Sequence, residues 1–190
     1  LKTDDAERVE AYRRQLLRND PSIVGAMTDV KGDRSLRPSD QKPHQDFYVR
    51  IVDESKDGIV VRGAKFHISQ TEAANEIFVC PTRAMREQDK DYAVSFAIPV
   101  NTPGVKLIVG AREPVEEGNF DEFPITAGKF TAECLIVFDD VFVPMERVFL
   151  KKEWQFAAQI AHMFGNFHRL YADTYKYNDL EILVGVAALM

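Results

Sequence analysis

The sequence is poor in the features that mark several large classes of protein. Its 190 residues contain two cysteines and one tryptophan, and 30 acidic residues outnumber 24 Lys and Arg, for a formal net charge of −6. No basic run is longer than a pair, so the clustered cations of a generic nucleic-acid surface are missing. No apolar run reaches the roughly 18 residues of a membrane span, and no signal-peptide pattern opens the chain. We expect a soluble, cytoplasmic protein without nucleic-acid or membrane partners.

Several catalytic and metal-binding motifs are also missing. The chain has no Gly-x-Ser-x-Gly, His-Glu-x-x-His or Cys-x-x-Cys, which leaves hydrolase and zinc functions without support. Cys80 and Cys134 each stand inside an apolar run, where a thiol behaves as a small buried hydrophobe. His162 and His168 do not share a helix face as an i, i+4 metal pair would. We predict buried thiols and no zinc site.

The middle of the chain predicts a β-rich domain. Hydrophobic residues make up 45% of the sequence, which is enough for one sizeable core. Strand-like runs are separated by turn signals such as Lys56-Asp57-Gly58 and Pro103-Gly104. Their regular spacing without intervening helices favours an antiparallel barrel or sandwich. The predicted strands cover residues 47–54, 59–66, 77–81, 91–100, 105–111 and 129–144.

Helical patterns flank this domain and make the predicted fold class α+β. Thr3 to Arg18 carries good helix formers, with Asp in the first turn and Arg in the last, before Asp20-Pro21 ends the helix. After Pro144, apolar residues recur at helical spacing with a break near Gly165-Asn166, which predicts two helices. The chain stops on an apolar helix without a cap, so we expect the natural protein to continue in both directions.

Three polar segments are candidates for a site. Met27 to Arg34 could offer backbone N–H groups and two cations to a pyrophosphate or carboxylate, but its glycine fits no P-loop or Rossmann turn, and a plain solvated loop is an equal alternative. Gly63 to Thr71 ends a strand with side chains that suit the polar edge of a planar heterocycle, although ordinary turn residues would look the same. His168 stands in a polar-aromatic cluster, as a site residue or a satisfied interface histidine.

Several motifs follow one another in a recognisable family order: GAMTDVKGDRSLRPS, DGIVVRGAK, KDYAVSFA, LIVFDDVFVP, GNFHR and GVAAL. On these motifs, the chain resembles the family that joins 4-hydroxyphenylacetate 3-monooxygenase and 4-hydroxybutyryl-CoA dehydratase, with most similarity to the dehydratase branch. The resemblance implies an acyl-CoA-dehydrogenase-like fold and a homotetramer that binds FAD. Residues 1–20 would end an N-terminal helical domain, 21–150 would form the flavin-binding middle domain, and 151–190 would begin a C-terminal helical domain.

The resemblance also implies site residues. Ser69 stands where the dehydratase branch has a Thr near the reactive edge of the flavin. His168 matches a histidine that ligates a [4Fe–4S] cluster in the dehydratase, but the cluster's cysteine position is Tyr175 here, and tyrosine does not normally replace a thiolate on cluster iron. We therefore expect no metal, with His168 and the retained Lys176 as catalytic groups. The expected FAD-binding residues are Met27, Thr28, Asp29, Lys31, Gly32, Asp33, Arg34, Lys65, His67 and Ser69.

These expectations favour a flavin-dependent oxidoreductase that acts by flavin redox or monooxygenase chemistry on an aromatic acid or an acyl-CoA. A flavin reductase would be its partner in the monooxygenase case. The alternative is a [4Fe–4S]/FAD 4-hydroxybutyryl-CoA dehydratase and vinylacetyl-CoA isomerase. A second alternative, from another class, is a non-catalytic fragment or interaction domain.

Overall fold

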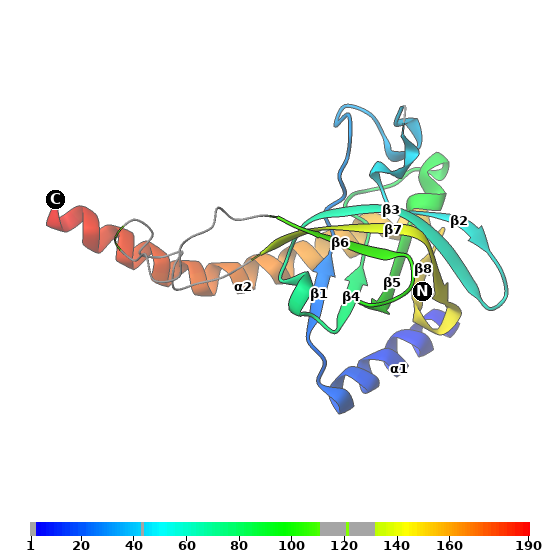
Figure 1. Ribbon diagram of the computed structural model, residues 1–190, viewed down its shortest axis with the longest axis horizontal. Coiled ribbons are helices and arrows are strands. Elements are labelled where there is room, and N and C mark those ends of the chain that lie inside the picture. The colour runs from blue at the N-terminus through cyan, green and yellow to red at the C-terminus, as the bar shows by residue number, and fades with distance from the viewer. Residues whose placement is uncertain (1–2, 43, 111–120, 122–131) are drawn as a thin grey trace.

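The computed structural model describes residues 3–42, 44–110, 121 and 132–190 (Figure 1). Within this part, the predicted α+β composition is confirmed. Residue 111 of the predicted strand 105–111 and residues 129–131 of the last predicted strand lie outside it. The two α-helices are α1 (Thr3–Asn19) and α2 (Trp154–Leu189). The strands are β1 (Ile23–Ala26), β2 (Arg50–Glu54), β3 (Gly58–Ser69), β4 (Glu76–Val79), β5 (Val94–Pro99), β6 (Val105–Val109), β7 (Glu133–Pro144) and β8 (Val148–Lys151).

The described strands form two sheets that enclose the main core. One sheet has the strand order β1-β4-β5-β8 and the other β2-β3-β7-β6. Buried and less buried residues alternate along β3 and β7, as expected for strands with one face against a core. Phe96 of β5 and Phe138 of β7 meet across the core in an edge-to-face contact, with ring centroids 5.8 Å apart. The described part of the chain therefore packs as a sandwich.

Two details of the predicted β-domain need correction. The described strands do not close into a barrel, because β1 and β8 end one sheet while β2 and β6 end the other. The sheet is also not entirely antiparallel, since β1 pairs with β4 in parallel, with Ile23 opposite Glu76. Parallel neighbours need a long crossover, and the chain supplies it by building β2 and β3 of the other sheet between these two strands.

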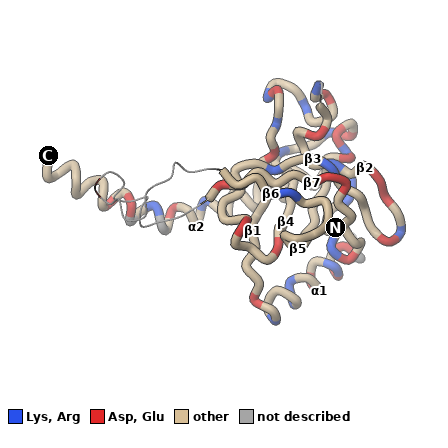
Figure 2. The backbone as a smooth tube through the Cα atoms, viewed as in Figure 1, with Lys and Arg blue, Asp and Glu red and all other residues tan. Residues whose placement is uncertain are grey.

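The predicted break near Gly165-Asn166 is wrong, because α2 runs without interruption from Trp154 to Leu189. A single glycine costs a helix only about 1 kcal/mol, which the flanking helix formers offset. The helix leaves the body of the molecule, and its far end carries neither acidic nor basic residues (Figures 1 and 2). Despite this length, no described helix is apolar enough to cross a membrane.

A compact cluster attaches α1 to the sheet. The Tyr12 hydroxyl donates to Oε2 of Glu76 at 2.6 Å, and Arg147 donates to the same oxygen at 3.1 Å. The Tyr12 ring also packs on Phe149 of β8, at 5.1 Å between centroids. Burial, with the Glu76 carboxylate beside it, raises the pKa of Tyr12. The cluster fixes α1 against β4 and β8.

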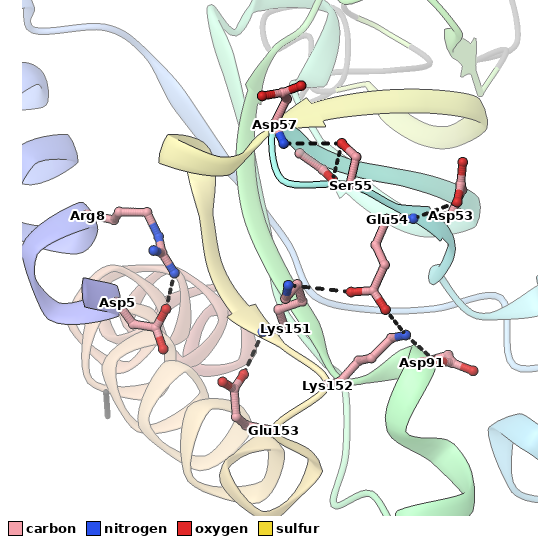
Figure 3. Close-up of polar contacts among 11 residues, drawn as sticks. Asp5, Arg8, Asp53, Glu54, Ser55, Asp57, Asp91, Lys151, Lys152 and Glu153 are labelled. Carbon is pink, nitrogen blue, oxygen red and sulfur yellow. Dashed lines mark hydrogen bonds and ion pairs between the residues drawn. The ribbon is translucent and has the colours of Figure 1, made fainter. Parts of the chain in front are cut away.

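Charged residues fix the point where α2 leaves the sheet (Figure 3). Nζ of Lys152 lies 2.6 Å from a carboxylate oxygen of Glu54, the last residue of β2, and 3.3 Å from one of Asp91. Lys152 has a positive φ of 67°, and its backbone N–H donates to the carbonyl of Ala93 at 2.9 Å. The Lys152 ammonium lowers the pKa of Glu54. The segment just before α2 is thereby held by contacts to the end of β2 and to the residues that precede β5.

Candidate functional site

The segment after β1 runs beside the end of β3, so two of the predicted site segments meet. The backbone N–H of Phe66 donates to the carbonyl of Thr28 at 2.8 Å, and Asp29 forms an antiparallel bridge with Lys65. This segment follows β1, a strand of four residues that the sequence pattern did not predict because Gly25 interrupts it.

A bulge turns the end of β3 toward this segment. The register of β3 against β7 shifts between Lys65 and Ile68, and His67 adopts a left-handed conformation with a φ of 58°. The His67 ring contacts the Phe66 ring at 3.9 Å between centroids. Bulges redirect side chains at sheet edges and beside sites. Here the bulge presents both Phe66 and His67 at the surface while Ile68 returns to the core.

The two segments and α2 line an open pocket of about 330 Å³. This volume lies within the range of about 300–1,000 Å³ that small-molecule sites occupy. The pocket brings together five of the residues predicted from the sequence, although they come from three distant segments. Its lining consists of Gly25, Met27 and Thr28, of His67, Ile68 and Ser69, and of Phe164, Gly165 and His168.

The helical wall of the pocket is built by residues one turn apart on α2. The rings of Phe164 and His168 are nearly parallel, with 10° between their planes and 6.4 Å between their centroids. Phe164 also lies so close to Gly25 that a β-carbon at position 25 would clash with the ring unless the ring moved. The sequence pointed to His168 but not to Phe164, Gly25 or Gly165, since small and aromatic residues carry no signal of a site by themselves.

Ser69 has a partner that the sequence did not suggest. Its hydroxyl donates to Oε1 of Glu133 at 2.6 Å, and the two residues are register partners between β3 and β7. Because the hydroxyl proton points to the carboxylate, Ser69 has only lone pairs left for another molecule. The sequence could have predicted this contact with Glu133 only if the register of β3 against β7 were already known.

Asp29 and Lys65 lie behind the pocket wall instead of lining it. Their side chains are 3% and 2% exposed, and Oδ1 of Asp29 lies 2.8 Å from Nζ of Lys65. Burial raises the pKa of Asp29, while the Lys65 ammonium and the backbone N–H of Val49, a donor to Asp29 at 3.2 Å, oppose the shift. These two predicted residues therefore form an internal ion pair under the segment that carries Met27 and Thr28.

The remaining predicted residues lie outside the pocket lining. Lys31 and Gly32 take successive positive φ values of 75° and 51°, so the chain turns sharply there. The turn is held by Gln41, whose Nε2 donates to the carbonyl of Asp33 at 2.7 Å, while hydrogen bonds from Ser35 lower the pKa of Asp33. Two further predicted residues, Arg34 in this turn and Lys176 about two turns beyond His168 on α2, are exposed.

Both cysteines are buried free thiols, and burial raises the pKa of Cys80 to about 11. Sγ of Cys134 lies 3.2 Å from Oε2 of Glu72. Among the described residues, no three His, Cys, Asp or Glu side chains are grouped to hold a metal ion. His162 has its Nε2 3.1 Å from the Nδ2 of Asn166 and is absent from the lining of the pocket.

Comparison with known proteins decides the family. Residues 2–150 match the family model described as the N-terminal part of 4-hydroxyphenylacetate 3-hydroxylase. The chain belongs to this family. It is 42% identical over 183 residues to the 4-hydroxybutyryl-CoA dehydratase/vinylacetyl-CoA Δ-isomerase of Clostridium aminobutyricum. It is 33% identical over 194 residues to the oxygenase component of 4-hydroxyphenylacetate 3-monooxygenase of Thermus thermophilus. The resemblance drawn from the motifs is confirmed.

Solved structures agree with both branches. An oxygen-tolerant archaeal 4-hydroxybutyryl-CoA dehydratase from N. maritimus matches 82% of the chain and 31% of its own length, with a TM-score of 0.76 and 38% identity. The oxygenase component of 4-hydroxyphenylacetate 3-monooxygenase complexed with FAD matches 82% of the chain and 32% of its own, with a TM-score of 0.73 and 32% identity. The chain spans 37% of the Clostridium protein and 38% of the Thermus protein, and these matches cover 94% and 97% of the chain.

Proposed function

We propose that this chain is the flavin-binding β-domain, with flanking helices, of an FAD-dependent oxidoreductase. The observation that carries the proposal is the pocket, which gathers Met27, Thr28, His67, Ser69 and His168 from three distant segments. A relative that shares the fold at a TM-score of 0.73 is described as complexed with FAD. Family membership and pocket geometry thus support the same cofactor.

The residues of the pocket fit a planar heterocycle with apolar faces and a polar edge. Met27, Ile68 and Phe164 offer apolar surface, while Thr28 and Ser69 offer polar groups. Ser69 gives its proton to Glu133, so its oxygen is free to accept a hydrogen bond from an N–H of a bound ring. Bound FAD would supply the redox chemistry, and the protein would hold the ring, orient it and exclude water.

The other predicted site residues are assigned roles around this ring. We assign His168, which lines the pocket, as a polar or acid–base group that faces substrate, with Lys176 as its neighbour along α2. Lys31 to Arg34, which lie outside the pocket lining, would lie along the rest of the FAD molecule. Thr28 and Met27 would contact it where the loop leaves β1.

The arrangement in the whole protein is proposed to be of the acyl-CoA-dehydrogenase type. Residues 1–20 would end a helical domain, 21–150 would form the β-domain, and 151–190 would begin a second helical domain. We propose a cytoplasmic homotetramer that acts on an aromatic acid or an acyl-CoA and, in the monooxygenase case, receives electrons from a flavin reductase. Relatives named as oxygenase components support the last point.

Titration of the full-length protein with FAD tests the proposal. Ser69→Ala removes a polar group from the pocket, and we expect its FAD affinity to fall by about tenfold, the equivalent of one lost hydrogen bond. Thr102→Ala is the matched control, because the Thr102 hydroxyl donates to the carbonyl of Pro99, in a turn outside the pocket. Failure of the unsubstituted protein to bind FAD would refute the proposal.

The second candidate is a cluster-containing dehydratase and isomerase. It is favoured by the 42% identity to a protein of that name, and opposed by Tyr175 at the position of a cluster cysteine. Anaerobic purification of the full-length protein separates the two candidates. We expect flavin without iron, whereas about four irons per subunit would establish the dehydratase.

The third candidate is a domain that does not bind flavin by itself. A titration of the 190-residue chain with FAD tests this alternative. Tight stoichiometric binding would exclude it, because a cofactor pocket missing a wall binds weakly.

A further inference from the structure

Lys65 uses all of its hydrogen-bonding capacity inside the protein. Its Nζ lies 2.8 Å from Oδ1 of Asp29, 2.8 Å from the carbonyl oxygen of Met27 and 2.9 Å from the carbonyl oxygen of Cys80. An ammonium group has three N–H donors and no acceptor. With three oxygen partners and a side chain that is 2% exposed, Lys65 has no donor left for a molecule in the pocket.

The three oxygen partners of Lys65 belong to different parts of the pocket's support. Met27 and Asp29 follow β1, Cys80 follows β4, and Lys65 itself stands on β3 immediately before the bulge. Asp29 extends the connection, because it accepts a hydrogen bond from the backbone N–H of Val49 at 3.2 Å. One ammonium group therefore joins both sheets at the place where the pocket wall begins.

A gain in stability does not explain this pair. Removing two charges from water costs several kcal/mol per ion, and a well-packed apolar pair of similar size is often as stable or more stable. Asp29 and Lys65 are nevertheless set among the side chains of Tyr48, Val79 and Pro81, in the interior. What the ion pair provides, and apolar residues would not, is a fixed position for the backbone carbonyl of Met27.

We propose that Lys65, together with Asp29, is a positioning residue for the cofactor. It holds the backbone of Met27 and Thr28 at a fixed distance from Ser69 across the pocket, and it acts through that backbone without touching the ring. The hydrogen bond from Phe66 to the carbonyl of Thr28 couples the same segment to the bulge. This inference rests on the proposed flavin site and specifies how its β-side wall is held.

The test uses the full-length flavoprotein and measures FAD affinity, the visible absorption bands of bound FAD and the midpoint of thermal unfolding. Lys65→Met leaves Asp29 buried without a counter-charge, so we expect lower stability and FAD affinity weaker by about tenfold or more. Lys106→Met is the matched control. Lys106 pairs with Asp139 at 2.7 Å, but both side chains are more than half exposed, and neither lines the pocket.

A double variant separates positioning from simple stability, and it stays informative if Lys65→Met does not fold. In Lys65→Met/Asp29→Leu, no charge is left unpaired, so the unfolding midpoint should rise above that of Lys65→Met. We expect FAD affinity to remain weakened, and the absorption bands of bound FAD at saturation to be shifted from those of the unsubstituted protein in both variants. Recovery of both affinity and spectrum together with stability would overturn the inference. Absence of FAD binding by the unsubstituted protein would overturn the proposed function, and this inference with it.

Discussion

Phe164 of α2 lies directly over Gly25 of β1, so that a β-carbon on Gly25 would come within 2.6 Å of the Phe164 ring. The contact sets the distance between the helical wall and the β-wall of the pocket, because both residues are part of its lining. The atoms that would clash are at the far end of a side chain that can turn. A substitution at Gly25 should therefore change the pocket more than it changes the stability of the fold.

Gly25→Ala tests this relationship. The added methyl group should push the Phe164 ring toward the cavity, which weakens FAD binding, while the unfolding midpoint changes little. Titration with FAD and thermal unfolding measure the two effects. In the control, Phe164→Leu is added to Gly25→Ala, which makes room for the methyl group and should recover part of the affinity. Unchanged affinity in Gly25→Ala would show that the ring has another place to go.

Two glycines of α2 allow a second comparison. Gly165 and Gly185 are both inside the helix, and an added β-carbon meets nothing within 4 Å at either position. Alanine should stabilise the helix at both positions, by about 0.5–1 kcal/mol. Only Gly165 lines the pocket, so only Gly165→Ala should lower FAD affinity, as measured by titration beside thermal unfolding. Equal affinity in both variants would place the cofactor away from this turn of the helix.

Asp89 provides a prediction about pH. This buried carboxylate accepts hydrogen bonds from the hydroxyl of Ser39 at 2.7 Å and from the backbone N–H groups of Ser39 and Arg86 at 3.1 and 3.0 Å. Burial would raise its pKa, but these hydrogen bonds outweigh burial and hold the pKa below the ordinary value. Its stabilising contribution is therefore complete above the unfolded-state pKa of about 4 and is lost as the pH falls through the lower, folded-state pKa.

Asp89→Asn should therefore destabilise the protein at pH 7 by about 1–3 kcal/mol, since one amide oxygen cannot replace two carboxylate oxygens. The difference from the unsubstituted protein should shrink as the pH falls below about 4. Denaturant unfolding at both pH values measures it. A difference that stays constant with pH would mean that the charge of Asp89 does not matter.

The attachment of α1 predicts a ranking of two variants. Tyr12→Phe removes one donor from Glu76 but leaves Arg147 in place, so the loss should be about 1.5–3 kcal/mol. Arg147→Met leaves a carboxylate that is 10% exposed without its counter-charge, and a loss of about 3–5 kcal/mol is expected. Denaturant unfolding of both variants gives the order, and the reverse order would assign the main role to the hydroxyl.

Much of the β-domain could be predicted because its longer strands carry their own signal. The alternation along β3 and β7 and the Lys56-Asp57-Gly58 turn are local, and the structure confirms the strands that they predicted. β1 was missed because four residues with a central glycine have no measurable period. Its parallel pairing with β4 depends on the path of the whole chain.

The candidate site, like the β-domain, has some features that the sequence predicts and others that depend on the folded structure. The family resemblance pointed to five residues that line the pocket, but it did not separate residues that line the pocket from those that support it. Asp29 and Lys65 look like ligand-binding groups in the sequence, because a charged residue says nothing about the partner it will find after folding. Likewise, the contact of Ser69 with Glu133 depends on strand register, and the continuity of α2 through Gly165 depends on its flanking helix formers.

The parallel pairing of β1 with β4 also has a consequence for the order of events during synthesis. Contacts between segments far apart in the chain form slowly, because the entropy cost of closing a long loop comes before the contacts can stabilise the chain. When Met27 and Thr28 are added to the growing chain, β4, the bulge of β3 and the helix with His168 have not yet been made. The growing chain therefore passes through a long stage with half a pocket, and uptake of any cofactor has to wait until the ribosome has moved well beyond residue 168.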